Sequence, residues 1–262
     1  MAMAGPVVRT YWLGRVPYRE AWELQRSLVA AVRDGSHDAG LLLLEHPHVF
    51  TIGRRGDGST LLWSEAECAA RGVEVVWSDR GGDATYHGPG QLVGYPILDL
   101  RRLAIDILRY LRDLERSLIS YLAELGLAAE PGGEGLTGVW AGGGKVAAIG
   151  VKLNRHVPSH GFALNLTTDL AIFNEGIVPC GLVGRRATSV QELDGPPVPV
   201  AEAARAYATH FARTFGVSCE WSDPAGLRRL PPAPPEPAPP AGNGLRTIPA
   251  PPAETGRTVK SA

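Results

Sequence analysis

Three stretches of the chain are typical of long helices. Residues 18–34 place apolar side chains three and four positions apart and are followed by Gly35, which predicts an amphipathic helix with a glycine stop. Residues 103–125 carry leucine or isoleucine on one face as far as Gly126, and they form the clearest predicted helix. Residues 200–215 predict a last helix. We expect the second of these helices to pack in the core.

Short apolar runs between these helices predict β-strands, because they are too short for a helix and lack its period. A helix between two of these runs is indicated by Ser64 and Glu67, which have the spacing of a capping box, and Gly72 ends it. The predicted strands cover residues 7–13, 41–44, 49–52, 73–77, 92–98, 146–151, 161–166 and 217–221.

Residues 78–100 break this pattern with four glycines and a proline between positions 81 and 90. That composition argues against a helix or a regular strand at 81–90. Glycine lets backbone N–H groups converge and lets a ligand lie close to the main chain. The same loop carries Arg80, Thr85, Tyr86 and His87. It is either an ordinary turn between two strands or a loop that contacts substrate.

Residues 145–181 hold the candidate chemistry. Nearly all positive charge in the chain is arginine, yet two of its three lysines, Lys145 and Lys152, lie here. Lysine can lose its proton when it is buried, whereas arginine cannot. Cys180 follows a proline and precedes Gly181, and a thiolate beside an ammonium is a usable nucleophile at neutral pH. The alternative is that Cys180 is a small buried apolar residue.

Composition excludes several classes of function. The net charge of −1 without basic runs argues against nucleic-acid binding, and there is no apolar run long enough to span a membrane. Three widely spaced cysteines form neither a disulfide framework nor a zinc pattern. His46 and His48 would point to opposite faces of a strand, so we expect packing or loop roles for them and no metal site. Free thiols and the absence of a signal-peptide pattern predict a cytoplasmic protein.

Two other cysteines are poorer candidates. Cys68 lies among Glu65 and Glu67, whose charges raise the pKa of a thiol, and Cys219 falls in a short strand and is expected to be structural. From about residue 223 the composition changes, and ten of the 22 prolines lie between positions 231 and 252. Such a segment buries little, so we expect a body over 1–222 and a Pro-rich, disordered tail over 223–262.

Five motifs occur in an order that resembles the lipoyl(octanoyl) transferases, or octanoyl-acyl carrier protein:protein N-octanoyltransferases. The resemblance covers roughly residues 7–222, and the order of the five makes it specific. The motifs are RGGDATYHGPGQ at 80–91, GVW at 138–140, KVAAIG at 145–150, HGFALN at 160–165 and VPCG at 178–181.

The resemblance implies the α+β fold of the biotin and lipoate protein ligases, a mixed β-sheet flanked by helices. It implies that octanoate arrives as a thioester on the acyl carrier protein, passes to Cys180, and ends as an amide on a lysine of a lipoyl domain. The implied acceptors are lipoyl domains of 2-oxoacid dehydrogenase complexes and the glycine cleavage H protein. Because a thioester is already activated, the reaction requires neither ATP nor a metal.

The resemblance also implies which residues form the site. Cys180 and Lys145 match the catalytic pair of the family, in which the lysine lowers the pKa of the cysteine. The implied acyl-substrate contacts are Arg80, Gly81, Gly82, Asp83, Ala84, Thr85, Tyr86 and His87 of the loop, Ala148, Ile149 and Gly150 of one strand, and Gly161, Phe162 and Ala163 of the next.

Three alternatives remain open from the sequence. An ATP-dependent lipoate or biotin ligase needs an acyl-adenylate site and no cysteine. A non-catalytic module that binds acylated carrier proteins needs neither Cys180 nor Lys145. A cysteine thioesterase would release free octanoate whether or not a lipoyl domain is present.

Overall fold

An eight-stranded mixed sheet forms the centre of the molecule, in a computed structural model that describes residues 5–133, 136–178 and 186–233. The strand order is β11-β1-β2-β6-β10-β9-β8-β7. β1 runs parallel to β2 and β11, and the other neighbours are antiparallel. The strands are β1 (Val7–Arg15), β2 (Ala39–Glu45), β6 (Gln91–Ile97), β7 (Glu130–Pro131), β8 (Gly138–Ala141), β9 (Gly144–Asn154), β10 (Val157–Asn165) and β11 (Ser218–Trp221).

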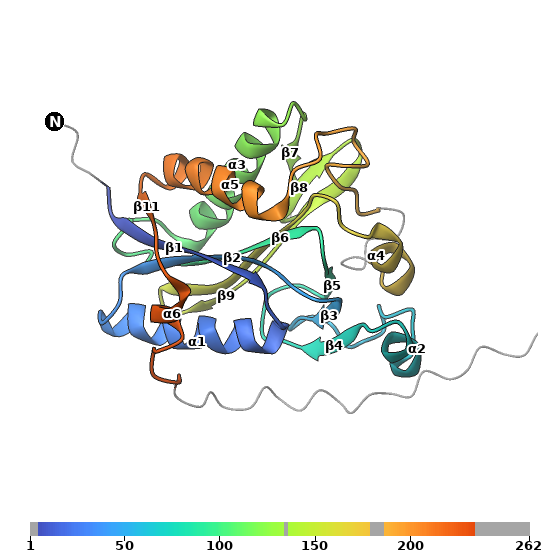
Figure 1. The fold of residues 1–262 in the computed structure, drawn as a ribbon, viewed down its shortest axis with the longest axis horizontal. Coiled ribbons are helices and arrows are strands. Elements are labelled where there is room, and N and C mark those ends of the chain that lie inside the picture. Colours follow the sequence, from blue (N-terminus) through green and yellow to red (C-terminus); the bar gives the residue numbers. More distant parts are fainter. Residues whose placement is uncertain (1–4, 134–135, 179–185, 234–262) are drawn as a thin grey trace, which may run out of the picture.

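Helices cover both faces of this sheet. Figure 1 shows α1 (Tyr18–Asp34) on one face, and α3 (Ile107–Glu124) and α5 (Val200–Phe215) together on the other. In α1, Gly35 adopts the left-handed conformation expected of a glycine stop. No helix in the described part of the chain is long and apolar enough to cross a membrane.

The four leucines of β2 show why that segment reads as a continuous apolar run. All four are fully buried. Leu41 and Leu43 pack with α3 and α5, whereas Leu42 and Leu44 pack with α1. A strand that is covered on both faces loses the alternation of apolar and polar residues that marks a half-exposed strand.

A smaller sheet stands beside the main one, in the order β4-β3-β5. Its strands are β3 (Val49–Ile52), β4 (Glu74–Trp77) and β5 (Ala84–His87). Phe50, Tyr86 and Phe173 are the large side chains of its core. Two short helices belong to this part, α2 (Glu65–Ala70) and α4 (Leu170–Gly176), and the capping box of Ser64 with Glu67 is present at α2.

Three local predictions need correction. Residues 84–87, inside the glycine-rich stretch, form a regular strand that pairs with β3; the glycines lie on either side of it. The helix predicted at 103–125 begins only at Ile107, because the Asp106 side chain accepts a hydrogen bond from the backbone N–H of Arg109 and caps it there. Helix α4 has no counterpart among the predicted elements.

The structure also differs from the sequence prediction at the junction with the Pro-rich segment. Residues 224–227 form a short helix, α6 (Pro224–Leu227), against β1. Leu227 is buried with the α1 face of the core, and Leu230 packs against the same cluster. The folded body therefore continues past residue 222.

Candidate active site

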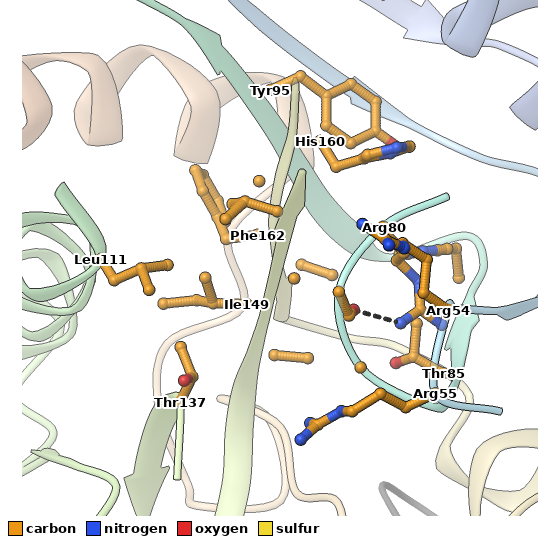
Figure 2. A pocket seen from close by; sticks show the side chains of 18 of the residues that line it. Arg54, Arg55, Arg80, Thr85, Tyr95, Leu111, Thr137, Ile149, His160 and Phe162 are labelled. Carbon is orange, nitrogen blue, oxygen red and sulfur yellow. Dashed lines mark hydrogen bonds between the residues drawn. The ribbon is translucent and has the colours of Figure 1, made fainter. Parts of the chain in front are cut away.

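A cavity of about 700 Å³ lies between the loop that follows β4 and the strands β9 and β10. Figure 2 shows lining residues on both sides of the central strands: Arg54, Arg55, Arg80 and Thr85 lie on one side, and Leu111 and Ile149 lie on the other. The cavity therefore has a basic side and an apolar side. Part of its apolar side comes from α3, through Leu111.

Small residues on β9 and β10 make room for the cavity. Gly150 lies opposite Gly161, and Ala148 lies opposite Ala163. Ala148, Gly150 and Ala163 share one face of the sheet, whereas a Cβ at Gly161 would meet the Gly94 carbonyl oxygen of β6. The loop lies directly on this face, since the Gly81 N–H donates to the Val151 carbonyl at 2.9 Å. A Cβ at Gly150 would come within 2.8 Å of the Gly81 carbonyl oxygen. The absence of a side chain there is what allows this approach.

Arg80 holds the loop in shape. Its side chain is 7% exposed, and its guanidinium donates to the backbone carbonyls of Thr51, Gly81 and Asp83 and to the Thr51 hydroxyl. A buried guanidinium that binds backbone carbonyls satisfies several acceptors at once. Arg80 thus fixes the backbone of Gly81 and Gly82 against the cavity.

Asp79 ties the same loop to both long strands. Its carboxylate accepts from Lys152 Nζ of β9 at 2.6 Å and from His160 Nε2 of β10 at 2.7 Å. Burial by itself would raise the pKa of Asp79, but the hydrogen bonds and charges of His160 and Lys152 outweigh it and hold the pKa well below the usual range. The carboxylate therefore stays ionised. His160 lines the cavity, while Asp79 lies behind it.

Buried histidines and tyrosines form the end of the cavity near β6. Tyr18, His87, Tyr95 and His160 line it. The Tyr95 hydroxyl lies 2.8 Å from Nε2 of His46, and the rings of Tyr18 and His87 stack at 5.8 Å. Burial lowers the pKa of His46 to about 4 and that of His87 well below its usual value, so both rings are neutral at pH 7.

Lys145 lies in β9 directly after a tight glycine turn and also lines the cavity. Its backbone N–H donates to the Arg186 carbonyl at 3.0 Å, and its carbonyl accepts from the Thr188 N–H at 3.0 Å. Its ammonium lies 4.5 Å from the centre of the Trp140 ring, within the range of a cation–π contact. The Trp140 ring thus holds the Lys145 ammonium on the face of β9 that carries Ala148 and Gly150.

Comparison with known proteins assigns the family. The family described as "Lipoyl protein ligase A/B catalytic domain" matches residues 17–212. The octanoyltransferase of Rubrobacter xylanophilus is 49% identical over 205 residues, which cover 78% of this chain and 91% of that protein. The octanoyltransferase of Geobacter sulfurreducens is 50% identical over 200 residues, covering 76% and 81%. The chain belongs to the octanoyltransferase family. It is an acyltransferase.

Solved structures of lipoate-protein ligases share the octanoyltransferase fold. Lipoate-protein ligase A bound with ATP aligns with a TM-score of 0.68 at 19% identity, covering 87% of this chain and 93% of that one. A bi-partite lipoate protein ligase from Thermoplasma acidophilum aligns with a TM-score of 0.66 at 19% identity, covering 87% and 91%. The predicted α+β fold, a mixed sheet flanked by helices, is confirmed.

The octanoyltransferase motifs converge on the cavity only in part. Cys180, the predicted nucleophile, lies outside the described residues. Asp83, Ala84 and Tyr86 do not line the cavity; the ring of Tyr86 packs in the small sheet's core, and its hydroxyl lies 2.7 Å from Nδ1 of His48. The predicted site residues that do line it are Lys145, Arg80, Gly81, Gly82, Thr85, His87, Ala148, Ile149, Gly150, Gly161, Phe162 and Ala163.

Sequence reasoning missed the group formed by Asp79, Lys152 and His160. A signal was present, since Lys152 is the second lysine in a stretch where arginine is otherwise the rule, and His160 opens one of the five motifs. What the sequence lacks is the pairing register: residues 79, 152 and 160 meet only when β9, β10 and the loop are folded together.

The two described cysteines have the surroundings of structural thiols. Cys68 is buried, and burial, followed by the charge of Glu67, raises the pKa of its thiol. Burial also raises the pKa of the half-buried Cys219. A thiol with a raised pKa is a poor nucleophile at neutral pH. Neither cysteine lines the cavity.

Proposed function

We propose that the chain transfers an octanoyl group from the thioester of an acyl carrier protein to a lysine amine of a lipoyl domain, through a thioester on Cys180. The observation that carries the proposal is a cavity in which the Lys145 side chain lies on the same face of the sheet as an apolar wall of small residues that includes Ala148 and Ala163. Burial of methylene groups is worth about 0.8 kcal/mol each, so such a wall retains an eight-carbon tail.

Chain connectivity supports the assignment of Cys180. Two residues before it, the Val178 N–H donates to the Thr60 carbonyl at 2.9 Å. The Thr60 hydroxyl donates at 3.1 Å to the carboxylate of Asp83, in the loop of residues 78–83 between β4 and β5, which we call the substrate loop. Six residues after it, the Arg186 carbonyl accepts from the Lys145 N–H. The described residues on either side of Cys180 therefore lie near the loop that carries Asp83 and beside Lys145.

In the first half-reaction, the Cys180 thiolate attacks the thioester carbonyl and expels the thiol of the carrier. Lys145 gives its proton to that leaving sulfur. In the second half-reaction, the neutral amine of the acceptor attacks the acyl-enzyme, and Lys145 takes up the proton that the amine loses while Cys180 leaves as a thiolate. The first step exchanges one thioester for another, and amide formation drives the second.

The partners that we propose are those that the family resemblance implies. The donor is octanoyl-acyl carrier protein, and the acceptors are lipoyl domains of 2-oxoacid dehydrogenase complexes and the glycine cleavage H protein. The Thermoplasma structure that shares this fold includes an E2 lipoyl domain in its description, which is consistent with such an acceptor. We also propose a cytoplasmic location.

The experiment mixes the protein with octanoyl-carrier protein and a lipoyl domain, with and without ATP, and follows the mass of the lipoyl domain. The proposal predicts one added octanoyl group, formed without ATP and blocked by Lys145→Met. No transfer from octanoyl-carrier protein, with octanoylation only when free octanoate and ATP are supplied, would identify a ligase instead. Release of free octanoate in the absence of the lipoyl domain, at the same rate, would identify a thioesterase.

A further inference from the structure

The cavity carries more positive charge than the proposed reaction uses. Arg54, Arg55, Arg80 and Lys145 line it, and among the described residues its lining contains no aspartate or glutamate. A fatty acyl thioester is uncharged, and an amine attacks in its neutral form. An anion is therefore expected somewhere on a substrate, since charge of one sign in a cleft concentrates ligands of the opposite sign.

Two of these cations already have roles. The Arg80 guanidinium is buried against backbone carbonyls, and Lys145 is the proposed proton carrier. Arg54 and Arg55, by contrast, have exposed side chains, and no hydrogen bond or ion pair joins those side chains to another described residue. They are the cations of the cavity that remain to be explained.

The turn that carries these two arginines is built onto the substrate loop. Arg54 N–H donates to the Arg80 carbonyl and Arg55 N–H donates to the Gly82 carbonyl, both at 3.0 Å. Gly53 N–H donates to the Asp83 carbonyl at 3.1 Å, and Gly56 N–H closes the turn on the Gly53 carbonyl at 3.0 Å. The Cα positions of the two arginines are therefore fixed beside the cavity before any ligand arrives, which lowers the entropy cost of binding.

We infer that Arg54 and Arg55 form a phosphate-binding subsite for the prosthetic arm of the donor. This inference rests on the proposed donor, an acyl carrier protein. The acyl thioester of such a carrier ends a phosphopantetheine arm, so a phosphodiester enters the site with every donor molecule. Guanidinium groups bind phosphate oxygens through paired N–H donors, and two adjacent arginines can bind different oxygens of one phosphate.

The test compares two small donors that differ only in the phosphate, octanoyl-phosphopantetheine and octanoyl-pantetheine. The readout is the ratio of their kcat/KM values for transfer to a lipoyl domain. The inference predicts a preference for the phosphorylated donor on the order of tenfold, because each exposed charge-assisted contact contributes modestly. Arg54→Gln with Arg55→Gln should bring the ratio close to one.

A matched control removes the same charge elsewhere. Arg33→Gln with Arg213→Gln changes two exposed arginines at the ends of α1 and α5, and it should leave the ratio as in the unmodified protein. A general loss of favourable charge would instead lower the ratio in both double variants, and that result would overturn the inference.

Other outcomes also decide the matter. Equal kcat/KM values for both donors with the unmodified protein would show that the protein does not recognise the phosphate, and would overturn the inference. If the Arg54/Arg55 variant loses activity on octanoyl-carrier protein but keeps the preference for the phosphorylated small donor, the arginines contact carboxylates of the carrier instead. Absence of transfer from every donor would refute the proposed function itself, and the subsite with it.

Discussion

Lys145 could be identified as a candidate site residue from the sequence, whereas Asp79 could not. Lys145 is conspicuous in the sequence, because arginine supplies nearly all other positive charge, and the structure places it in the cavity. Asp79 is one of many acidic residues in the chain. Its importance depends on the burial of its two partners, and only the folded structure brings Lys152 and His160 to the same carboxylate.

Replacement of Asp79 by Asn should loosen the substrate loop. The amide cannot accept from both His160 and Lys152 as an ionised carboxylate does, so we expect a loss of about 2 kcal/mol in the free energy of unfolding. We also expect a rise in KM for the octanoyl donor, because the loop lines the acyl cavity. Urea denaturation and steady-state kinetics measure the two effects.

Asp38 offers a matched control for that variant. It pairs with Arg9 at 3.4 Å, but both side chains are about half exposed, at 53% and 41%. Asp38→Asn should change the free energy of unfolding by well under about 1 kcal/mol, as exposed pairs do. Equal losses in the two variants would mean that Asp79 is an ordinary surface carboxylate.

At the scale of elements, apolar periodicity predicted most strands and the three long helices. It failed where local chemistry set the boundary: Asp106 starts α3 later than its leucine pattern does, and β5 lies inside a glycine-rich stretch. Pairing with β3 decides the conformation of β5, and tertiary contacts of this kind are absent from local composition. The same holds for the small-residue face of β9 and β10, which depends on their register.

That small-residue face predicts a change in chain-length preference. Ala148→Leu adds three carbons to the cavity lining and should shorten the space left for the acyl tail. One methylene in an apolar pocket is worth about 1–3 kcal/mol, so kcat/KM for an octanoyl donor should fall about tenfold or more relative to a butanoyl donor. Thioester donors of graded length measure this ratio.

The control for that substitution is Ala66→Leu, on the exposed face of α2. It adds the same carbons away from the cavity, and the octanoyl-to-butanoyl ratio should stay as it is in the unmodified protein. An unchanged ratio in Ala148→Leu would place the acyl tail elsewhere.

At the scale of the whole molecule, the end of the folded body follows from two leucines. The proline content of the final segment correctly marks where composition changes, but it does not register Leu227, which is 1% exposed, or Leu230 beside it. A single apolar residue beyond a change in composition hardly alters a sequence pattern, but its burial can stabilise the folded core. Their burial against the α1 face had to come from the structure.

Two truncations test this boundary. Removal of residues from 223 onward exposes the site filled by Leu227, so we expect a loss of about 2–3 kcal/mol and a fall in Tm of about 5–10 °C. Removal from 234 onward takes away a Pro-rich segment and should leave Tm and activity nearly unchanged. Calorimetry on both truncated proteins measures the two Tm values. Equal values would mean that the folded body ends at residue 222, as the sequence predicts.

Buried histidines predict how stability depends on pH. Burial lowers the pKa of His46 to about 4 and also lowers that of His87 and His160. In the unfolded chain these rings take up protons near pH 6.5, before the folded chain does. The contribution of these histidines to the free energy of unfolding is therefore fully present above about pH 6.5 and is lost as the pH falls toward about 4.

The free energy of unfolding should consequently drop between about pH 7 and pH 5. Each histidine contributes a slope of up to about 1.4 kcal/mol per pH unit within its window. Urea titrations at several pH values measure the slope directly. A flat profile over this range would mean that the three rings titrate alike in the folded and unfolded chain.

The central claim, a covalent octanoyl-enzyme on Cys180, is tested most directly by the intact mass of the protein after mixing with octanoyl-carrier protein alone. The account predicts one added octanoyl group, located on Cys180 by peptide mapping, present in Cys68→Ala and Cys219→Ala and absent in Cys180→Ala. Addition of a lipoyl domain should then remove the group from the enzyme and place it on the acceptor. An unmodified enzyme mass, together with transfer that persists in a folded Cys180→Ala protein, would contradict the account.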